Sequence, residues 1–278
     1  MKESTILPDL RMLPTALLQP HEEMDPLRVE KLSQRLKQEE RLKHPPVVAP
    51  IPSTERFVVL DGANRTMALA ALRVPHIVAQ VIHYDDPGVE LDTWYHVVSG
   101  MPVEEFRSEL HRIPGLEARE TGLPAARQEL AQDRTAAYIV FAEGVYLVKD
   151  AENHQPRDID FLNKLVRIYK GRAEIFRASN DVWEKQAPFY PEMTALVVFP
   201  RLQPQDILGA VRENRRVPSG ITRHIIPNRA LNINIPFDIL EAGLSLEEKR
   251  AWLHDWLMER MAANAIRFYA EPTFTFDE

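Results

Sequence analysis

Asp61 and Gly62 stand between an apolar run and a run of strong helix formers, and this is the first place in the chain suited to chemistry. A turn from a strand into a helix leaves the first backbone N–H groups of the helix unpaired, with the positive end of the helix dipole behind them. Such a turn favours a phosphate group. Gly62 lets a ligand approach the backbone closely, and Arg65, one turn further on, can donate paired hydrogen bonds to phosphate oxygens.

Asp61 supplies the carboxylate of this turn, at the carboxyl end of the expected strand. It could hold a magnesium ion through water, or it could order the turn. A simpler interpretation fits the same spacing: Asp61 caps the helix, and Arg65 is a solvated side chain. The Asp-Gly pair alone does not decide between these interpretations.

A second candidate segment is His21-Glu22-Glu23, just before Asp25. Carboxylates so close together repel one another, although the N-terminus of a following helix offsets part of that repulsion. The segment is therefore either a solvated helix start or a place that holds a reactive carboxylate.

A third candidate segment is Thr222-Arg223-His224. If these residues are extended, Thr222 and His224 share one face of the strand and Arg223 takes the other. The surroundings are locally basic, because six arginines lie from Arg201 to Arg229 against Asp206 and Glu213. A charged surface strand is the simpler interpretation.

The elements that must position these residues follow from hydrophobic spacing and from capping signals. Asp25 can cap a helix, Pro26 suits its first turn, and Pro45 lies beyond its end. In order, the predicted elements are a helix over 25–43, extended segments at 47–49 and 56–60, a helix over 63–73, and strands over 76–83 and 94–98.

A different pattern of helix and strand segments begins near residue 100, which we take as a domain boundary. Ser245 and Glu248 have the spacing of a capping box and predict the start of the last helix. The elements predicted in this half are helices over 103–111, 125–133, 158–170, 205–215 and 245 to about 268, a hairpin of 136–141 with 145–148, and a strand over 195–199.

The composition excludes several classes of protein. The 278 residues contain no cysteine, so disulfides, thiolate metal sites and cysteine nucleophiles are excluded. A net charge of −7, from 41 acidic and 34 basic residues, disfavours nucleic-acid binding. No signal peptide and no apolar stretch of membrane-spanning length is visible, so we expect a cytoplasmic protein without a membrane partner.

The usual nucleotide and hydrolase motifs are also absent from the sequence. It contains no Gly-x-x-x-x-Gly-Lys loop, no Gly-x-Gly-x-x-Gly, no His-Glu-x-x-His and no Gly-x-Ser-x-Gly. A nucleotide site in this chain would therefore belong to a less common fold.

Taken together, the three segments resemble the free L-serine kinases of the ParB/sulfiredoxin-like fold, which are archaeal enzymes with bacterial relatives in siderophore pathways. The resemblance covers both ends of the chain and is weak between about 101 and 195. The stretches that carry it are 18–23, the helix with Arg28 and Leu32, 44–48, 58–65, 68–69, 222–226, 231–236 and 269–273. It implies an α+β protein with a ParB/sulfiredoxin-like domain over 1–100 and a second α/β domain over 101–278 packed over it, with the site between them.

The resemblance also implies roles for individual residues. Glu22, rather than Glu23, matches the base near the serine hydroxyl, and Asp61 is its companion in the catalytic site. The turn at Asp61-Gly62 would hold the nucleotide phosphates. The segment Thr222-Arg223-His224, which we call the late motif, would bind the substrate together with Trp94. The implied phosphate-binding residues are Asp61, Gly62, Ala63, Asn64 and Arg65, and the implied substrate-binding residues are Trp94, Thr222, Arg223 and His224.

Three positions depart from the family pattern. Asn64 stands where the family usually has His, and Gly220 and Ile221 stand where it has Lys followed by Thr or Ser. Asn64 can still donate a hydrogen bond to a phosphate. A positive charge and a hydroxyl are missing at the late motif.

The implied reaction transfers a phosphoryl group from ATP or ADP, with Mg²⁺, to the hydroxyl of L-serine or a similar amino acid, in a monomer or a homodimer. Two alternatives remain at this point: a ParB-like, nucleotide-dependent DNA-binding regulator, and a sensor that binds nucleotide and amino acid without catalysis. Sulfiredoxin activity is excluded because its nucleophile is a cysteine.

Overall fold

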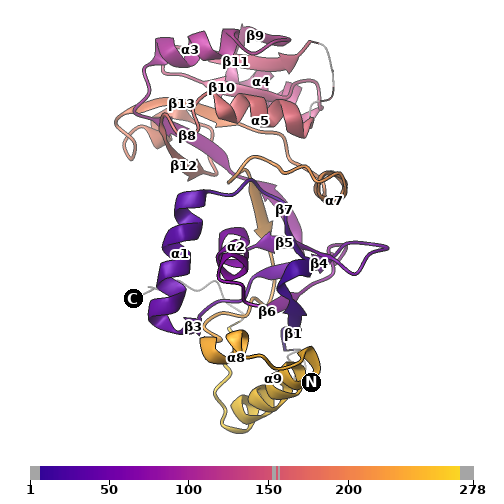
Figure 1. Cartoon of the computed structure of the whole chain (residues 1–278). Helices are drawn as coiled ribbons and strands as arrows, with labels where there is room; N and C mark the ends of the chain where they lie inside the picture. Colours follow the sequence, from indigo (N-terminus) through magenta and orange to yellow (C-terminus); the bar gives the residue numbers. More distant parts are fainter. Residues whose placement is uncertain (1–6, 152–154, 156, 270–278) are drawn as a thin grey trace. The chain divides into compact units, whose positions relative to one another are not determined.

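The computed structural model describes residues 7–151, 155 and 157–269, and the chain forms two compact units (Figure 1). Unit 1 contains residues 7–19, 25–88 and 226–269 of the described chain. Unit 2 contains the short segment 20–24 and the described part of 89–225. Each unit combines helices with largely antiparallel sheets, so the expected α+β class is confirmed.

Unit 1 is built around a five-stranded sheet. Its order is β1 (Leu10–Pro14), β6 (His76–Val81), β4 (Val47–Pro50), β5 (Phe57–Asp61) and β2 (Leu18–Pro20). The pairs β1–β6 and β4–β5 are antiparallel, whereas β4 and β6 are parallel. Val58 and Val59, in the apolar run before Asp61, are fully buried, which explains why that run reads as a continuous hydrophobic strand.

Helix α1 (Pro26–Glu39) begins where the capping signal predicts. The Asp25 side chain accepts hydrogen bonds from the N–H groups of Leu27 (3.0 Å) and Arg28 (3.3 Å). The helix ends at Glu40, whose φ of 50° is left-handed, and so it stops short of the predicted residue 43. Helix α1 packs against α2 (Ala63–Ala71), which follows β5 directly (Figure 1).

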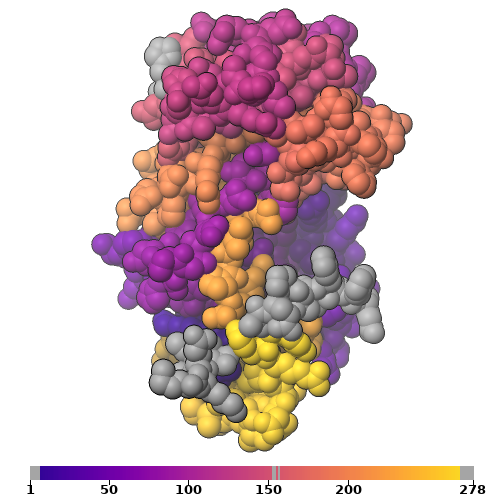
Figure 2. All heavy atoms as spheres, turned by 180° about the vertical axis from the view of Figure 1, so that it is seen from behind, coloured from indigo at the N-terminus to yellow at the C-terminus, as the bar shows by residue number. Residues whose placement is uncertain are grey.

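The C-terminal part of the chain belongs to unit 1, which differs from the expected division at residue 100. The strand β15 (Ile235–Pro236) pairs with β3 (Arg41–Leu42) and leads into α8 (Phe237–Glu241) and α9 (Leu246–Ala262). Ile235, Leu240 and Leu253 are buried in the same core as residues of β1 and β6. The apolar faces of β15, α8 and α9 complete the core of the five-stranded sheet. Figure 2 shows the orange segment after residue 226 leading to the yellow atoms of α9.

Unit 2 contains a six-stranded antiparallel sheet. Its order is β12 (Glu174–Ala178), β8 (Tyr95–Ser99), β13 (Met193–Val198), β10 (Ala137–Val140), β11 (Val145–Asp150) and β9 (Leu116–Thr121). The predicted hairpin is confirmed as β10 and β11. Beside this sheet, β7 (Glu90–Thr93) and β14 (Thr222–Ile225) form an antiparallel pair.

Four of the helices described in unit 2 begin close to their predicted positions, whereas the short helix α6 (Trp183–Gln186) is not predicted from the sequence. The other four are α3 (Val103–His111), α4 (Leu123–Ala131), α5 (Ile159–Arg167) and α7 (Pro204–Arg212). Asp158 caps α5 by accepting hydrogen bonds from the N–H groups of Asp160 and Phe161. The predicted last helix is α9 of unit 1; its capping box of Ser245 and Glu248 is confirmed, but it ends at Ala262 rather than near 268.

Two sequence expectations concern the ends and the environment of the chain. The family-like ending at 269–273 lies outside the described residues after Tyr269. No helix in the described part of the chain has the length and apolar composition needed to cross a bilayer.

Candidate active site

The turn between β5 and α2 requires a glycine. Gly62 has a φ of +84°, and a Cβ atom there would lie 3.0 Å from Arg65 Nη1 and 3.1 Å from Pro46 Cα. The left-handed backbone disfavours any other residue, and the backbone of Pro46 leaves no room for a side chain. Gly62 thus brings the chain from β5 into α2 within one residue.

The start of α2 leaves backbone donors for a ligand. The first hydrogen bond of the helix runs from the Thr66 N–H to the Gly62 carbonyl (2.9 Å), so the N–H groups of Ala63, Asn64 and Arg65 have no helical acceptor. Within the described residues, no side chain caps this helix. The arrangement fits an anion.

Asp61 does not cap α2. Its Oδ2 atom accepts a hydrogen bond from Nη2 of Arg229 instead. The interpretation in which Asp61 is a helix cap is therefore wrong. The ion pair places a second arginine beside the turn, contributed by the C-terminal segment of unit 1.

Arg65 is not a solvated side chain. It is partly buried, and its Nη1 lies 3.4 Å from the carbonyl oxygen of Pro45. Burial lowers the pKa of Arg65; the negative charge of Asp61 opposes this shift and the positive charge of Arg229 adds to it. A guanidinium that has lost water in this way gains more from an anion than an exposed one.

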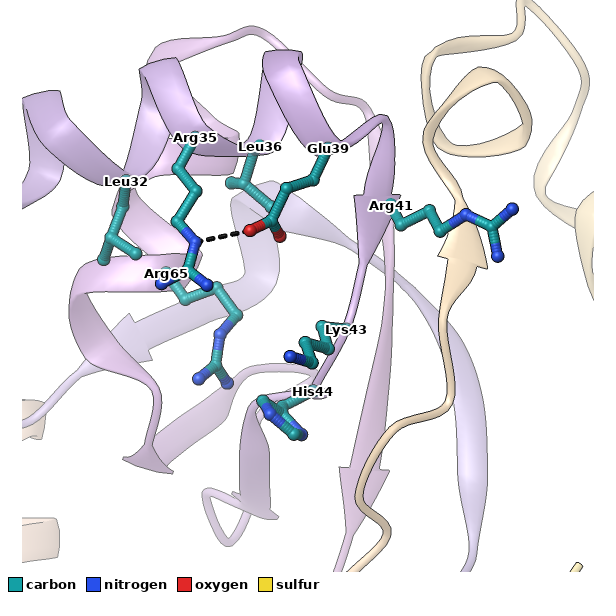
Figure 3. Close-up of a pocket in the computed structure, with 8 residues that line it drawn as sticks. All are labelled: Leu32, Arg35, Leu36, Glu39, Arg41, Lys43, His44 and Arg65. Carbon is teal, nitrogen blue, oxygen red and sulfur yellow. Dashed lines mark hydrogen bonds and ion pairs between the residues drawn. The ribbon is translucent and has the colours of Figure 1, made fainter. Parts of the chain in front are cut away.

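Arg65 also lines a basic pocket of about 250 Å³ in unit 1 (Figure 3). The remaining lining residues are Leu32, Arg35, Leu36, Glu39, Arg41, Lys43 and His44. Arg35 is paired with Glu39 at 2.5 Å, whereas the side chains of Lys43, His44 and Arg65 point into the same space. Leu32, His44 and Arg65 belong to stretches singled out in the sequence, whereas Arg35, Arg41 and Lys43 have no predicted role. The basic residues between 35 and 44 are the signal that could have indicated them.

Glu22 lies in unit 2 and binds a hydroxyl group. Thr222 Oγ1 donates a hydrogen bond to Glu22 Oε1, and His21 Nε2 lies 2.8 Å from the same hydroxyl oxygen. Because a hydroxyl has one hydrogen, the Thr222 oxygen accepts from an Nε2–H of His21. The Glu22 side chain is 15% exposed, and His21 and Thr222 are 2% and 8% exposed.

His224 completes this cluster. Its ring meets the ring of His21 edge-on, with centroids 5.1 Å apart. Strand β14 is extended, so Thr222 and His224 share a face as predicted. The structure therefore brings Glu22, Thr222 and His224 together across 200 residues of sequence, and it adds His21, which belongs to the second candidate segment but had no predicted role.

Neighbouring Glu23 has a different environment from Glu22. Its carboxylate contacts Lys170 Nζ at 2.6 Å and Arg167 Nη2 at 3.6 Å. The Glu23 N–H donates to the Val217 carbonyl (2.8 Å), and the Val217 N–H donates to the His21 carbonyl (2.8 Å). These bonds anchor the segment 20–24 within unit 2 and leave Glu22 as the carboxylate that faces Thr222.

Trp94 and Arg223 lie together, on the other face of the β7–β14 pair. The Arg223 guanidinium carbon is 4.3 Å from the centre of the Trp94 ring, and Nη1 is 3.7 Å from Asp92 Oδ2. Arg223 pairs with Asp92 across the strands, opposite in side-chain direction to Thr222 and His224. These two residues thus form a separate group from the Glu22 cluster.

Sequence comparisons identify similar proteins of known name. No family model matches the chain. It is 26% identical over 270 residues to the ATP-dependent L-serine kinase SbnI of Staphylococcus aureus, covering 97% of each protein. It is also 26% identical over 254 residues to the ATP-dependent L-serine kinase of Staphylothermus marinus, covering 85% of this chain and 95% of that one.

Structural comparisons give the same picture of the fold. A C-terminally truncated SbnI from Staphylococcus aureus superposes with a TM-score of 0.72 at 23% identity, over 91% of this chain and 97% of that one. A free serine kinase in complex with AMP has a TM-score of 0.71 at 17% identity, over 86% and 98% of the two chains. The resemblance indicated by the motifs is thereby confirmed: along nearly its whole length this chain is similar to the L-serine kinases, and it has their fold.

Proposed function

We propose that this protein is a free L-serine kinase that transfers the terminal phosphoryl group of ATP to the serine hydroxyl, giving O-phospho-L-serine. The observation that carries the proposal is the Glu22 carboxylate, largely buried and bound to a hydroxyl group, in a chain similar over 97% of its length to an ATP-dependent L-serine kinase. A carboxylate that holds a hydroxyl is the group a kinase needs for its acceptor.

The phosphates of the nucleotide bind at the start of α2, in the turn from Asp61 to Arg65, which we name the phosphate turn. The free N–H groups of Ala63, Asn64 and Arg65 are donors there, and the partly desolvated Arg65 guanidinium supplies charge. The basic pocket that Arg65 shares with Lys43 and His44 extends this phosphate-binding surface.

Asp61 is the residue of this turn that would hold Mg²⁺. One oxygen is engaged by Arg229, and the side chain is 43% exposed. Nucleotide-bound Mg²⁺ commonly uses one or two carboxylates and completes its shell with phosphates and water, so a single aspartate fits. When bound, the ion neutralises charge on the phosphates.

Glu22 acts on the acceptor. Thr222 occupies Oε1, so Oε2 is the atom that orients the serine hydroxyl and takes its proton. The serine oxygen forms a bond to the terminal phosphorus, the bond from that phosphorus to the bridging oxygen breaks, and ADP leaves with that electron pair. The transition state is loose, so alignment and charge neutralisation supply most of the acceleration.

Thr222 and His224 lie beside Glu22 and form the amino-acid side of the proposed site, whereas Trp94 and Arg223 lie on the other face of the β7–β14 pair. Chain connectivity links this side to the phosphate turn. Three peptide bonds join Glu22 to Asp25, which limits the distance between their Cα atoms to about 11 Å. The Asp25 N–H in turn contacts Asn64 Oδ1 at 3.4 Å.

The proposal is tested by incubating the protein with Mg²⁺, ATP or ADP, and a panel of amino acids, and by following products with phosphorus NMR. We expect a phosphoserine resonance with ATP and serine, and less product with amino acids that lack a hydroxyl. Absence of phosphoserine with both donors would overturn the proposal. Calorimetric binding of ATP and serine without turnover would instead support the sensor alternative.

A further inference from the structure

The guanidinium of Arg177 lies against the backbone just before Thr222. Gly220 has a φ of +83°, and a Cβ atom there would lie 3.1 Å from Arg177 Nε and 3.2 Å from Nη2. The space beside this glycine is therefore occupied by a charged group that comes from β12. Gly220 precedes Thr222 by two residues, which limits their Cα atoms to about 7 Å.

The position of Arg177 is fixed by the sheet beneath it. Arg177 pairs directly with His96 across β12 and β8, so both side chains project from the same face. His96 is buried, and its Nδ1 lies 2.9 Å from the Tyr169 hydroxyl. Burial lowers the pKa of His96 to about 3, and the charge of Arg177 contributes to this shift, so the group beside Arg177 is a neutral imidazole.

The other cations near the Glu22 cluster already have partners. Lys170 binds Glu23 at 2.6 Å, Arg223 contacts Asp92 and stacks on Trp94, and Arg216 Nη1 lies 3.2 Å from the Pro20 carbonyl. Arg177 is exposed and makes no ion pair with any residue in the described part of unit 2. It is therefore a guanidinium available to an anionic ligand.

A free amino acid brings such an anion to this place. In the proposed reaction the serine hydroxyl lies at Glu22, and only two carbon atoms separate that hydroxyl from the carboxylate group of the same molecule. A guanidinium binds a carboxylate through two parallel hydrogen bonds, which gives both strength and orientation.

We propose that Arg177 binds the α-carboxylate of the acceptor and so makes this enzyme specific for free amino acids over amino alcohols. The inference rests on the proposed serine kinase function. Arg177 is assigned to substrate recognition, and Glu22 remains the group that acts on the hydroxyl.

The test compares serine with ethanolamine, which keeps the hydroxyl and the amine but lacks the carboxylate. The variants are R177Q and R177K, and the matched control is R119Q, an exposed arginine on β9 at the opposite edge of the same sheet. Initial rates give kcat and KM for both acceptors, and thermal unfolding verifies that each variant is folded.

For R177Q we expect kcat/KM for serine to fall by about 10- to 100-fold, mainly through KM, as for loss of hydrogen bonds to a charged group. The rate with ethanolamine and the KM for ATP should change less than about twofold, R177K should recover part of the serine activity, and R119Q should match the wild type. The preference for serine over ethanolamine should therefore nearly disappear in R177Q alone.

Equal losses with both acceptors, or no loss with serine, would overturn the role of Arg177. Failure of the proposed function is a separate result, because it appears as absence of serine phosphorylation in the wild type. In that case calorimetric binding of serine to the wild type and R177Q still decides whether Arg177 holds the carboxylate: equal affinities reject it, and weaker binding to R177Q supports it.

Discussion

The phosphate turn of unit 1 and the Glu22 cluster of unit 2 differ in charge and in the kind of hydrogen-bonding groups that they present. The turn gathers backbone donors and a desolvated guanidinium, all within Asp61 to Arg65, and suits an anion. The cluster gathers a carboxylate, a hydroxyl and imidazoles from positions 200 residues apart and suits a hydroxyl acceptor. The comparison teaches that a group of anion donors can be local in sequence, because one turn supplies them, whereas a carboxylate, a hydroxyl and imidazoles meet here only through tertiary structure.

The largest expected effect is that of a substitution at Glu22, which should lower catalysis without changing nucleotide binding. E22Q keeps the size of the side chain but removes the proton acceptor, so we predict that kcat falls by about 10²- to 10⁴-fold. ATP binding should be unchanged, because the phosphate turn lies in the other unit. Steady-state kinetics and calorimetry with ATP measure the two effects.

Glu23 provides the matched control for this variant. E23Q removes an ion pair with Lys170 and Arg167, and we expect a loss of less than about fivefold in kcat. Equal losses in E22Q and E23Q would assign the effect to the fold of the segment rather than to the Glu22 carboxylate.

The next effect concerns Arg65. R65M removes a partly buried guanidinium from the phosphate turn, so the affinity for ATP should fall by about 10- to 100-fold while serine affinity is retained. R56M changes an exposed arginine before β5 and should leave both affinities unchanged. A loss of serine binding with intact ATP binding in R65M would reverse the assignment of the two regions.

A smaller effect tests the buried imidazole of unit 2. The pKa of His96 is about 3 in the folded chain against about 6.5 when unfolded, so between these values the unfolded chain holds a proton that the folded chain lacks. Stability from this group is complete above pH 6.5 and is lost as the pH falls toward 3. Between pH 7 and 5 it should contribute a drop of about 2 kcal/mol in the free energy of unfolding.

The H96Q variant isolates this contribution. Urea denaturation of the wild type and H96Q at pH 7 and pH 5 should show a smaller drop in the variant, because glutamine does not titrate. If the free energy of unfolding falls equally in both proteins between pH 7 and pH 5, titration of His96 does not contribute to the pH dependence of stability.

The smallest effect compares two glycines with nearly the same backbone. Gly62 and Gly100 have φ of +84° and +81°, but a Cβ atom meets Pro46 and Arg65 at the first and nothing within 4 Å at the second. Both G62A and G100A lose about 1 kcal/mol from the left-handed backbone. G62A should lose about 1 kcal/mol more from crowding, measured by denaturation, and should also weaken ATP binding.

Much of the local structure could be predicted because its signals lie within a few residues. The Asp25 cap, the capping box at Ser245 and the glycine turn after β5 all follow from short-range rules. The predicted ranges of α1 and α9 extend past the ends of these helices at Glu39 and Ala262, because charged and apolar residues continue the helical pattern beyond the point where the backbone leaves the helix.

Other features depend on long-range contacts for which the sequence carries no local signal. The packing of residues 226–269 with the first sheet, the pocket around Lys43 and His44, and the role of His21 all require the fold. The most instructive case is Gly220, which stands where the family pattern has a lysine. The structure places Arg177, 43 positions earlier, against that glycine.

The assignment of residues 20–24 to unit 2 has a consequence for the way Glu22 is linked to unit 1. This pentapeptide carries Glu22, and both of its chain neighbours, Gln19 and Asp25, belong to unit 1. Two of the four points at which the chain passes from one unit to the other therefore lie within three residues of Glu22. Glu22, the proposed base, is thus joined to unit 1 by only three peptide bonds on each side, through Gln19 and through Asp25.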